Sequence, residues 1–302
     1  MKVLMSGASG LIGTAFHRLL EADGNEVHSL VRGEPLAARQ VRWDPVAGRF
    51  DPAALDGVEA LVHLSGEPIM GLRWSAAKKK AIRDSRVQST SLLCGVVAKS
   101  PNPPKVWLCA SAIGYYGSRG DEPLDETSRA GAGFLSDVCQ EWEAATDPAR
   151  KRGIRVVNLR FGVVLSPQGG ALKAMLTPFR MGLGGAQGDG RQYMSWITLR
   201  DAAEAFMHLL STENVEGPVN LVSPTPVTNR EFASILGKVL RRPAVLPLPA
   251  FAARLAMGEM ADETVLASTR VYPKRLQESG FEFAHPDLEM ALRAMLYPVG
   301  SD

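Results

Sequence analysis

The stretch that decides the fold is Val3-Leu4-Met5-Ser6-Gly7-Ala8-Ser9-Gly10-Leu11-Ile12-Gly13, an apolar run that leads into three evenly spaced glycines. Apolar residues then recur at helical spacing as far as Asp23-Gly24, which predicts a strand, a tight turn and an amphipathic helix in succession. Gly7 allows the sharp turn off the strand, Gly10 lets the backbone approach a pyrophosphate, and Gly13 permits close packing of the helix on the sheet. Because the start of a helix offers free N–H groups and a partial positive charge, this pattern predicts a dinucleotide-binding turn.

Further strands and helices alternate beyond this turn. Apolar segments rich in Val, Leu and Ala predict strands at 27–31, 59–64, 106–110 and 155–159, and helical composition lies between them at 75–99 and 134–152. This alternation predicts an α/β fold with a doubly wound parallel Rossmann sheet. After residue 165 glycine-rich loops and further helices follow. We therefore expect a nucleotide-binding domain at 1–165, with some later strands crossing back, and a smaller, mostly helical C-terminal substrate domain at 166–302.

The composition narrows the classes of partner and compartment. The 302 residues include 34 Lys and Arg against 32 Asp and Glu, a net charge of +2 that gives no reason to expect nucleic acid or an acidic membrane as partner. Cys94, Cys109 and Cys139 are an odd number at wide spacings, so we expect neither a disulfide framework nor a zinc site. The five histidines lack ligand spacing, and we predict no metal. We expect no signal peptide and no membrane span, hence a soluble, cytoplasmic protein.

The residue that follows the second predicted strand bears on the choice of cofactor. NAD-binding sites place an acidic residue here for the ribose 2′-hydroxyl, whereas this chain reads Ser29-Leu30-Val31-Arg32-Gly33. A guanidinium pairs well with a 2′-phosphate, so Arg32 favours NADP over NAD. The alternative is that Arg32 is a solvated surface residue and that Glu34 recognises the ribose.

Several motifs together resemble a known family. The glycine turn, His63-Leu64-Ser65-Gly66 and the segment from Ala110 to Gly117 resemble the extended short-chain dehydrogenase/reductases of the NAD-dependent epimerase/dehydratase superfamily. The resemblance is closer to an atypical, epimerase-like branch that carries a C-terminal domain of unknown function, and it covers essentially the whole chain. The motifs that carry it are Ser65-Gly66-Glu67-Pro68-Ile69, Arg73-Trp74, Ser85-Arg86-Val87, Gly114-Tyr115-Tyr116-Gly117 and Ser195-Trp196-Ile197.

The resemblance implies a catalytic pattern that this chain does not keep. The superfamily uses a Tyr-x-x-x-Lys helix, in which the tyrosine moves the proton and the lysine lowers its pKa. Here the corresponding helix places Phe134 at the tyrosine position and Val138 at the lysine position. The usual asparagine of the preceding long helix is replaced by Arg86. Ser111 matches the superfamily's Ser or Thr, unless an offset of one residue puts Ala112 there. We therefore expect the usual mechanism to be absent.

Replacement groups for catalysis lie close to Ser111 in the sequence. Tyr115 or Tyr116 could reach a carbonyl, and we name Ser111 and Tyr116 as the catalytic candidates. The alternative is that these tyrosines pack against the second domain and use their hydroxyls for structure. The fingerprint and the resemblance together predict cofactor contacts at Gly7, Ser9, Gly10, Leu11, Ile12, Gly13, Arg32, Leu64, Ser65, Gly66, Arg86, Ser111, Arg160 and Gly162.

Three functions remain open at the level of the sequence. The first is an NADP(H)-binding epimerase- or oxidoreductase-like protein that acts on an unidentified small molecule without the Tyr-x-x-x-Lys pair. The second is a non-catalytic NADP(H)-binding sensor or regulator, and the third is an interaction protein with a vestigial site. In each case we expect a monomer or a homodimer with no nucleic-acid or membrane partner.

Overall fold

The computed structural model describes residues 1–71 and 73–297. Its centre is an eight-stranded sheet in the order β12-β8-β6-β5-β1-β2-β3-β4. All neighbours in this sheet pair in parallel except β3 and β4, which form an antiparallel edge. The strands are β1 (Lys2–Ser6), β2 (Glu26–Val31), β3 (Gln40–Asp44), β4 (Arg49–Phe50), β5 (Ala60–His63), β6 (Val106–Ala112), β8 (Arg155–Phe161) and β12 (Gly217–Leu221). The predicted doubly wound parallel fold is confirmed.

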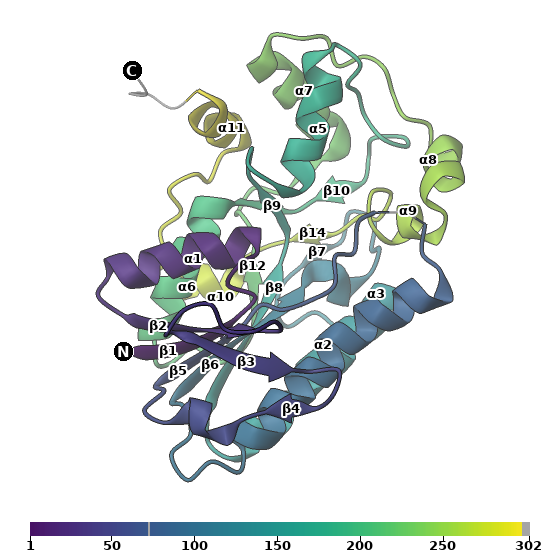
Figure 1. Ribbon diagram of the computed structural model, residues 1–302. Coiled ribbons are helices and arrows are strands. Elements are labelled where there is room, and N and C mark those ends of the chain that lie inside the picture. Colours follow the sequence, from purple (N-terminus) through teal and green to yellow (C-terminus); the bar gives the residue numbers. More distant parts are fainter. Residues whose placement is uncertain (72, 298–302) are drawn as a thin grey trace.

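Helices cover both faces of the sheet (Figure 1). On one face lie α1 (Leu11–Ala22) and α6 (Leu199–Ser211), which contribute Phe16, Leu20 and Phe206 to one hydrophobic core. On the other lie α2 (Ala76–Val97), α3 (Phe134–Ala144) and α4 (Asp147–Lys151), which contribute Leu93, Trp142 and Ala149 to a second core. The buried positions of α1 and α2 recur every three or four residues, because only one stripe of each helix faces the sheet.

The prediction of one helix over 134–152 is wrong in one respect. The structure divides this segment into α3, which ends at Ala144, and α4, which begins at Asp147. Pro148 explains the break, since it lacks the N–H that a continuous helix would donate to the carbonyl of Ala144.

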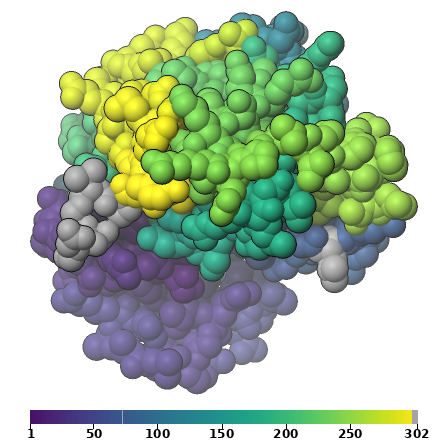
Figure 2. All heavy atoms as spheres, turned by 90° about the horizontal axis from the view of Figure 1, so that it is seen from above, coloured from purple at the N-terminus to yellow at the C-terminus, as the bar shows by residue number. Residues whose placement is uncertain are grey.

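The region after residue 165 is mostly helical, as predicted, and packs around a third core that includes Leu176, Phe232 and Leu292. Figure 2 shows this region, in green and yellow, in front of the amino-terminal part. Two elements from this region, β12 and α6, join the central sheet and its helical cover. The helices of the region are α5 (Gly170–Arg180), α7 (Asn229–Leu240), α8 (Ala250–Met257), α9 (Glu259–Glu263), α10 (Lys274–Glu278) and α11 (Leu288–Leu296). Short strand pairs form separate two-stranded sheets: β9 (Val163–Leu165) with β11 (Trp196–Thr198), β10 (Tyr193–Met194) with β13 (Val227–Thr228), and β7 (Pro123–Leu124) with β14 (Arg270–Val271).

The structure also bears on membranes, metals and disulfides. Within residues 1–71 and 73–297, none of the helices combines the length and apolar character that a membrane crossing requires. The same residues contain no cluster of three His, Cys, Asp or Glu side chains suited to a metal ion. Cys94, Cys109 and Cys139 are buried, free thiols.

Candidate functional site: the glycine turn and the strand ends beside it

The glycine turn joins β1 to α1 with very little room for side chains. Gly7 has φ +74°, and a Cβ on it would lie 2.8 Å from the carbonyl carbon of Leu64. A Cβ on Gly13 would lie 2.1 Å from the carbonyl oxygen of Gly7. Only glycine at this position therefore lets α1 pack so closely against the turn. The Gly10 N–H closes the turn by donating to the Gly7 carbonyl at 3.1 Å. Gly7 and Gly13 therefore have the turn and packing roles that the sequence predicted, and the approach of Gly10 to a pyrophosphate stays a prediction.

The amino terminus of α1 is open to an anion. The residue that precedes the helix, Gly10, offers no side chain to cap it, and the first turn carries no acidic residue. The N–H groups of Leu11, Ile12 and Gly13 lie in this first turn, where a helix has no internal acceptor for them. The turn also lies where the strand order reverses, since β1 is flanked by β2 and β5. Ligands of doubly wound sheets bind at such a point, so the cradle fits a pyrophosphate.

Arg32 and Glu34 follow β2, at the same edge of the sheet. Glu34 pairs with Arg42 on the neighbouring strand β3. The Arg32 side chain is exposed, and it has no ion-pair partner in the part of the chain that the structure describes. A carboxylate that already holds a guanidinium is a poorer partner for a ribose hydroxyl, whereas an exposed, unpaired guanidinium suits a phosphate. Of the two alternatives left open by the sequence, the geometry favours Arg32.

The loop after β5 brings Leu64, Ser65 and Gly66 next to the glycine turn and to Arg86 of α2. A Cβ on Gly66 would lie 3.2 Å from the Cζ atom of Arg86, so the loop backbone packs directly on the guanidinium. Arg86 is 9% exposed, and burial lowers the pKa of this arginine from its ordinary value. The sequence predicted these residues as cofactor contacts, and the structure groups Leu64 and Ser65 with Gly7.

A second group of polar residues lies at the ends of β6 and β8. Glu143 of α3 accepts two hydrogen bonds from Arg160, at 2.7 Å from Nε to Oε1 and at 2.8 Å from Nη2 to Oε2. The Ser111 hydroxyl donates to the same carboxylate at 2.7 Å. Burial on its own would lower the pKa of Arg160, but the bonded carboxylate raises it above its ordinary value. Glu143 was missed in the sequence because nothing near it in the chain signals its partners.

Tyr116 belongs to this same network. Its side chain is fully buried, and its hydroxyl donates to Asn220 Oδ1 at 2.8 Å and accepts from Arg160 Nη1 at 2.9 Å. Burial raises the pKa of Tyr116 to about 12. These are the contacts of the structural alternative, in which the hydroxyl holds the strand end in place. Tyr115 is half-buried, and its ring faces the Arg160 guanidinium with 3.5 Å between Cζ and the ring centroid.

The helix that carries the catalytic pair in the superfamily has apolar residues at the site. Phe134 packs edge-on against Trp74, with 5.3 Å between ring centroids, and Lys79 Nζ lies 4.6 Å from its ring. Leu135 is the residue that faces the turn after Ser111, since a Cβ on Gly114 would lie 3.3 Å from the Leu135 Cβ. The predicted correspondence to Phe134 and Val138 stays a prediction, and a shift by one residue would place Leu135 and Cys139 there. Either register lacks the phenol and the ammonium group.

The C-terminal region caps this helix. Glu263, at the end of α9, accepts hydrogen bonds from the backbone N–H groups of Phe134 at 3.0 Å and of Leu135 at 3.1 Å. Gly133 makes this approach possible, because a Cβ there would lie 2.4 Å from the Glu263 carboxylate. Glu259 of the same short helix pairs with Lys79 of α2 at 2.7 Å. No pattern in the sequence predicts either contact.

Gly162 lies behind the strand ends. A Cβ on it would lie 2.6 Å from the Ser195 carbonyl oxygen and 2.6 Å from Cγ1 of Val222. This glycine therefore allows β8 to pack against the chain before β11 and after β12. Its contact with a cofactor stays a prediction.

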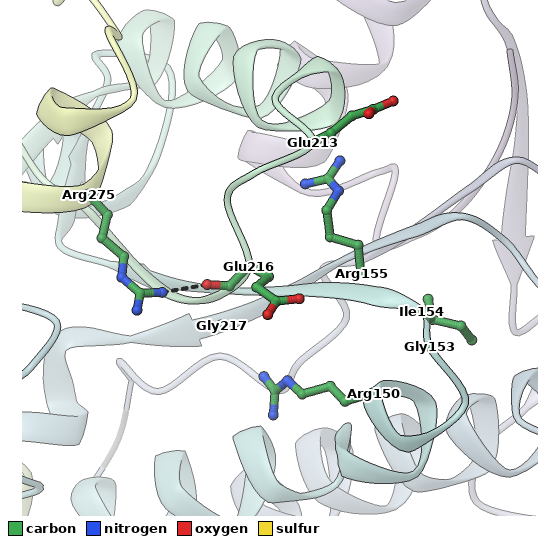
Figure 3. A pocket seen from close by; sticks show the side chains of 8 residues that line it. All are labelled: Arg150, Gly153, Ile154, Arg155, Glu213, Glu216, Gly217 and Arg275. Atoms are coloured by element: carbon green, nitrogen blue, oxygen red, sulfur yellow. Dashed lines mark hydrogen bonds between the residues drawn. The ribbon is translucent and has the colours of Figure 1, made fainter.

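A pocket at the opposite edge of the sheet is not part of this site (Figure 3). It lies where β8 and β12 begin, and its arginines are used by the fold. Arg155 donates to the carbonyls of Leu209, Leu210 and Val215, and Arg275 donates to that of Glu216. Since ligands of doubly wound sheets bind at the carboxyl ends of the strands, we assign this pocket a structural role.

The sheet order and the open glycine turn at its reversal define a Rossmann protein of the dinucleotide-binding class. More closely, the chain belongs to the NAD dependent epimerase/dehydratase family, whose model matches residues 3–221. Residues 248–295 match a domain described as a domain of unknown function, DUF1731. The predicted family and its C-terminal domain are confirmed.

Similar proteins span the whole chain. The epimerase family protein Mb2239 of Mycobacterium bovis is 45% identical over 96% of this chain and 96% of its own length. Human epimerase family protein SDR39U1 is 38% identical over 98% of this chain and 100% of its own length. A crystal structure of the human protein with NADPH has a TM-score of 0.89 at 34% identity and covers 99% of this chain and 100% of that one. A nucleoside-diphosphate sugar epimerase of Corynebacterium glutamicum has a TM-score of 0.81 at 36% identity, over 98% of this chain and 58% of that one.

Proposed function

We propose that this protein binds NADP(H) and acts as an epimerase- or oxidoreductase-like protein on a small molecule. The observation that carries the proposal is the glycine turn with its open helix end, followed at the next strand by the exposed Arg32. The turn would hold the pyrophosphate, and Arg32 would pair with the 2′-phosphate that distinguishes NADP from NAD. The similarity to the human protein that was crystallised with NADPH supports this choice of cofactor.

Bound NADP(H) would supply or accept a hydride at its nicotinamide. The chain's own residues would have to position the substrate and move a proton without a tyrosine–lysine pair on α3. The hydroxyls of Ser111 and Tyr116, our catalytic candidates, are both bonded to the Glu143–Arg160 pair: Ser111 donates to Glu143, and Tyr116 accepts from Arg160. Their contribution to catalysis would therefore be to fix the strand ends through this network. A proton donor would come from another group, for which half-buried Tyr115 is the candidate.

The alternative function is a non-catalytic sensor of NADP(H). The missing phenol and ammonium on α3 favour it, and so does the contact of α9 with the start of that helix, since a cofactor near α3 would then affect the C-terminal region. A sensor would bind NADPH and NADP⁺ with different affinities but turn over no substrate.

The first experiment is a titration of the purified protein with NADPH and with NADH, followed by melting temperature and nucleotide fluorescence. We expect saturable stabilisation by NADPH that exceeds that by NADH, because a ligand of the native state raises its stability. No stabilisation by either nucleotide would contradict both the enzyme and the sensor. A panel of carbonyl compounds and sugar nucleotides with NADPH oxidation as readout then separates the two, since any turnover favours the enzyme.

The cellular compartment and the partners of the protein are part of the proposal as well. Three buried, free cysteines suit a reducing compartment such as the cytoplasm. We propose a small-molecule substrate and a monomer or homodimer, with no role for nucleic acid because the net charge is only +2.

A further inference from the structure

Arg86 is a buried cation that the fold leaves without a carboxylate. Its residue is 9% exposed, and it forms no ion pair in the part of the chain that the structure describes. Three other cations around the same strand ends are each paired: Arg160 with Glu143, Lys78 with Glu67 and Lys79 with Glu259. An uncompensated buried charge is costly to a fold, so its presence points to a partner that the chain itself does not supply.

The guanidinium is held on one side only. Nη1 donates to the carbonyl oxygens of Glu67 and Ile82, both at 3.0 Å. The backbone of Gly66 and the ring of Trp142, with 5.2 Å between Cζ and the ring centroid, pack against the group. Nε and Nη2 have no acceptor among the residues that the structure describes. The guanidinium is thus fixed in place while the N–H groups of Nε and Nη2 stay available. These two groups suit a two-point contact with an oxyanion.

The contacts of Arg86 place it between the loop after β5 and α3. Its contacts run to the loop after β5 and to Trp142 of α3, the helix on which the superfamily carries its catalytic pair. Because ligands of doubly wound sheets bind outside the carboxyl ends of the strands, a cofactor whose pyrophosphate lies at the glycine turn would extend its nicotinamide toward β5 and β6. Burial lowers the pKa of Arg86 by more than the charges of Cys139 and Glu67 raise it, although neither group forms an ion pair with the guanidinium.

We propose that Arg86 binds an anionic group of the substrate beside the nicotinamide, so that the substrate is a small-molecule carboxylate or phosphate ester. This inference rests on the proposed NADP(H) function and names the substrate class for the same site. It assigns to Arg86 a role in substrate recognition in place of the cofactor contact that the sequence predicted for this residue.

The test uses protein saturated with NADPH and two simple probes, malonate for carboxylates and inorganic phosphate for phosphate esters, at constant ionic strength set with chloride. We compare the wild type with Arg86→Met and with the control Arg83→Met, which removes an exposed arginine one turn earlier on α2. In the wild type and the control we expect one probe to raise the melting temperature with saturation, because it binds the native state. In Arg86→Met that rise is lost while the NADPH Kd is unchanged.

Four results would each overturn the proposal. If neither probe stabilises the NADPH-loaded wild type, the arginine holds no anion. If Arg86→Met weakens NADPH binding about tenfold, a change of about 1.4 kcal/mol, or if the effective probe competes with NADPH, the group serves the cofactor. Should Arg86→Met fail to fold, Arg86→Lys replaces it: the charge stays, the two-point contact is lost, and unchanged probe binding would contradict the geometry. The NADPH titration of the wild type is a separate measurement, and a failure to bind NADPH would overturn the proposed function itself.

Discussion

The carboxylate of Glu143 and the guanidinium of Arg160 form a doubly hydrogen-bonded ion pair, in which the side chains are only 12% and 3% exposed. This pair connects α3 to β8 and receives the Ser111 hydroxyl, while Arg160 also contacts both Tyr115 and Tyr116. It lies next to the position where the superfamily has its catalytic helix pair. We interpret it as the framework that holds these strand ends in the absence of that pair.

Breaking the ion pair on one side should destabilise the fold strongly. Arg160→Met leaves the Glu143 carboxylate buried without its partner, and we expect the free energy of unfolding to fall by about 3–5 kcal/mol in urea titrations. The control Arg83→Ala removes the exposed partner of Glu141 and should cost less than about 1 kcal/mol. Equal effects of the two variants would show that the buried pair is not the stabilising framework.

A methyl group in the glycine turn should abolish nucleotide binding. Gly13→Ala places a Cβ 2.1 Å from the Gly7 carbonyl oxygen, so the turn must open. We expect the free energy of unfolding to fall by about 3 kcal/mol or more and NADPH binding to be lost. The matched control is Gly95→Ala, within α2, where a Cβ meets no atom within 4 Å. It should stabilise the protein by about 0.5–1 kcal/mol and leave NADPH binding intact. NADPH binding by a folded Gly13→Ala protein would contradict the role of the turn.

Removal of the Arg32 guanidinium should change cofactor preference rather than stability. Arg32→Ala loses the pairing with the 2′-phosphate, so we expect NADPH affinity to fall about tenfold or more while NADH affinity stays unchanged. Arg18→Ala, which removes an exposed arginine from α1, serves as the control and should leave both affinities as they are. If instead Glu34→Ala is the variant that alters the preference, the ribose is read by Glu34.

Buried His63 should make the protein sensitive to mild acid. Burial lowers its pKa from 6.5 to about 3, and Nδ1 lies 2.6 Å from the Ser6 hydroxyl, with Nε2 3.1 Å from that of Ser89. The unfolded chain therefore binds a proton below about pH 6.5 that the folded chain does not accept until about pH 3. The free energy of unfolding is therefore unaffected by the titration of His63 above about pH 6.5. It falls as the pH drops below this value, by about 1.4 kcal/mol for each pH unit well below 6.5.

The measurement is urea unfolding at several pH values between about 7.5 and 5. The variant His63→Asn lacks the titrating group, so its stability should fall less steeply with acid than that of the wild type, even if it is less stable at neutral pH. Parallel pH profiles for the two proteins would exclude His63 as the source of the acid sensitivity.

The contact of Glu263 with α3 should control the order of that helix's first turn. Glu263→Ala removes the acceptor of the Phe134 and Leu135 N–H groups, and we expect faster hydrogen exchange at these amides with a loss of about 1 kcal/mol in stability. Glu259→Ala, which breaks the pair with Lys79 but leaves the cap, should not change that exchange. Unaltered exchange in Glu263→Ala would mean that the turn is ordered by packing alone.

Much of the fold and part of the site could be read from the sequence because their causes are local. The strand, the glycine turn and α1 are adjacent, and each glycine is required by backbone conformation or by packing within a few residues. The alternation of strands and helices fixed the parallel sheet. The break between α3 and α4 has a local cause as well, because Pro148 lies in the first turn of α4.

The sequence by itself determined that the chain folds as a doubly wound sheet with an open glycine turn and that α3 lacks the phenol and ammonium of its superfamily. Only the tertiary structure decided which polar groups are paired. Glu143 pairs with Arg160, and Glu263 accepts hydrogen bonds from the first N–H groups of α3, whereas Arg86 forms no ion pair in the described chain. The physical reason is sequence distance, since Glu263 and Phe134 are 129 residues apart. Pairing across such distances follows from how helices pack on the sheet, which local patterns do not encode.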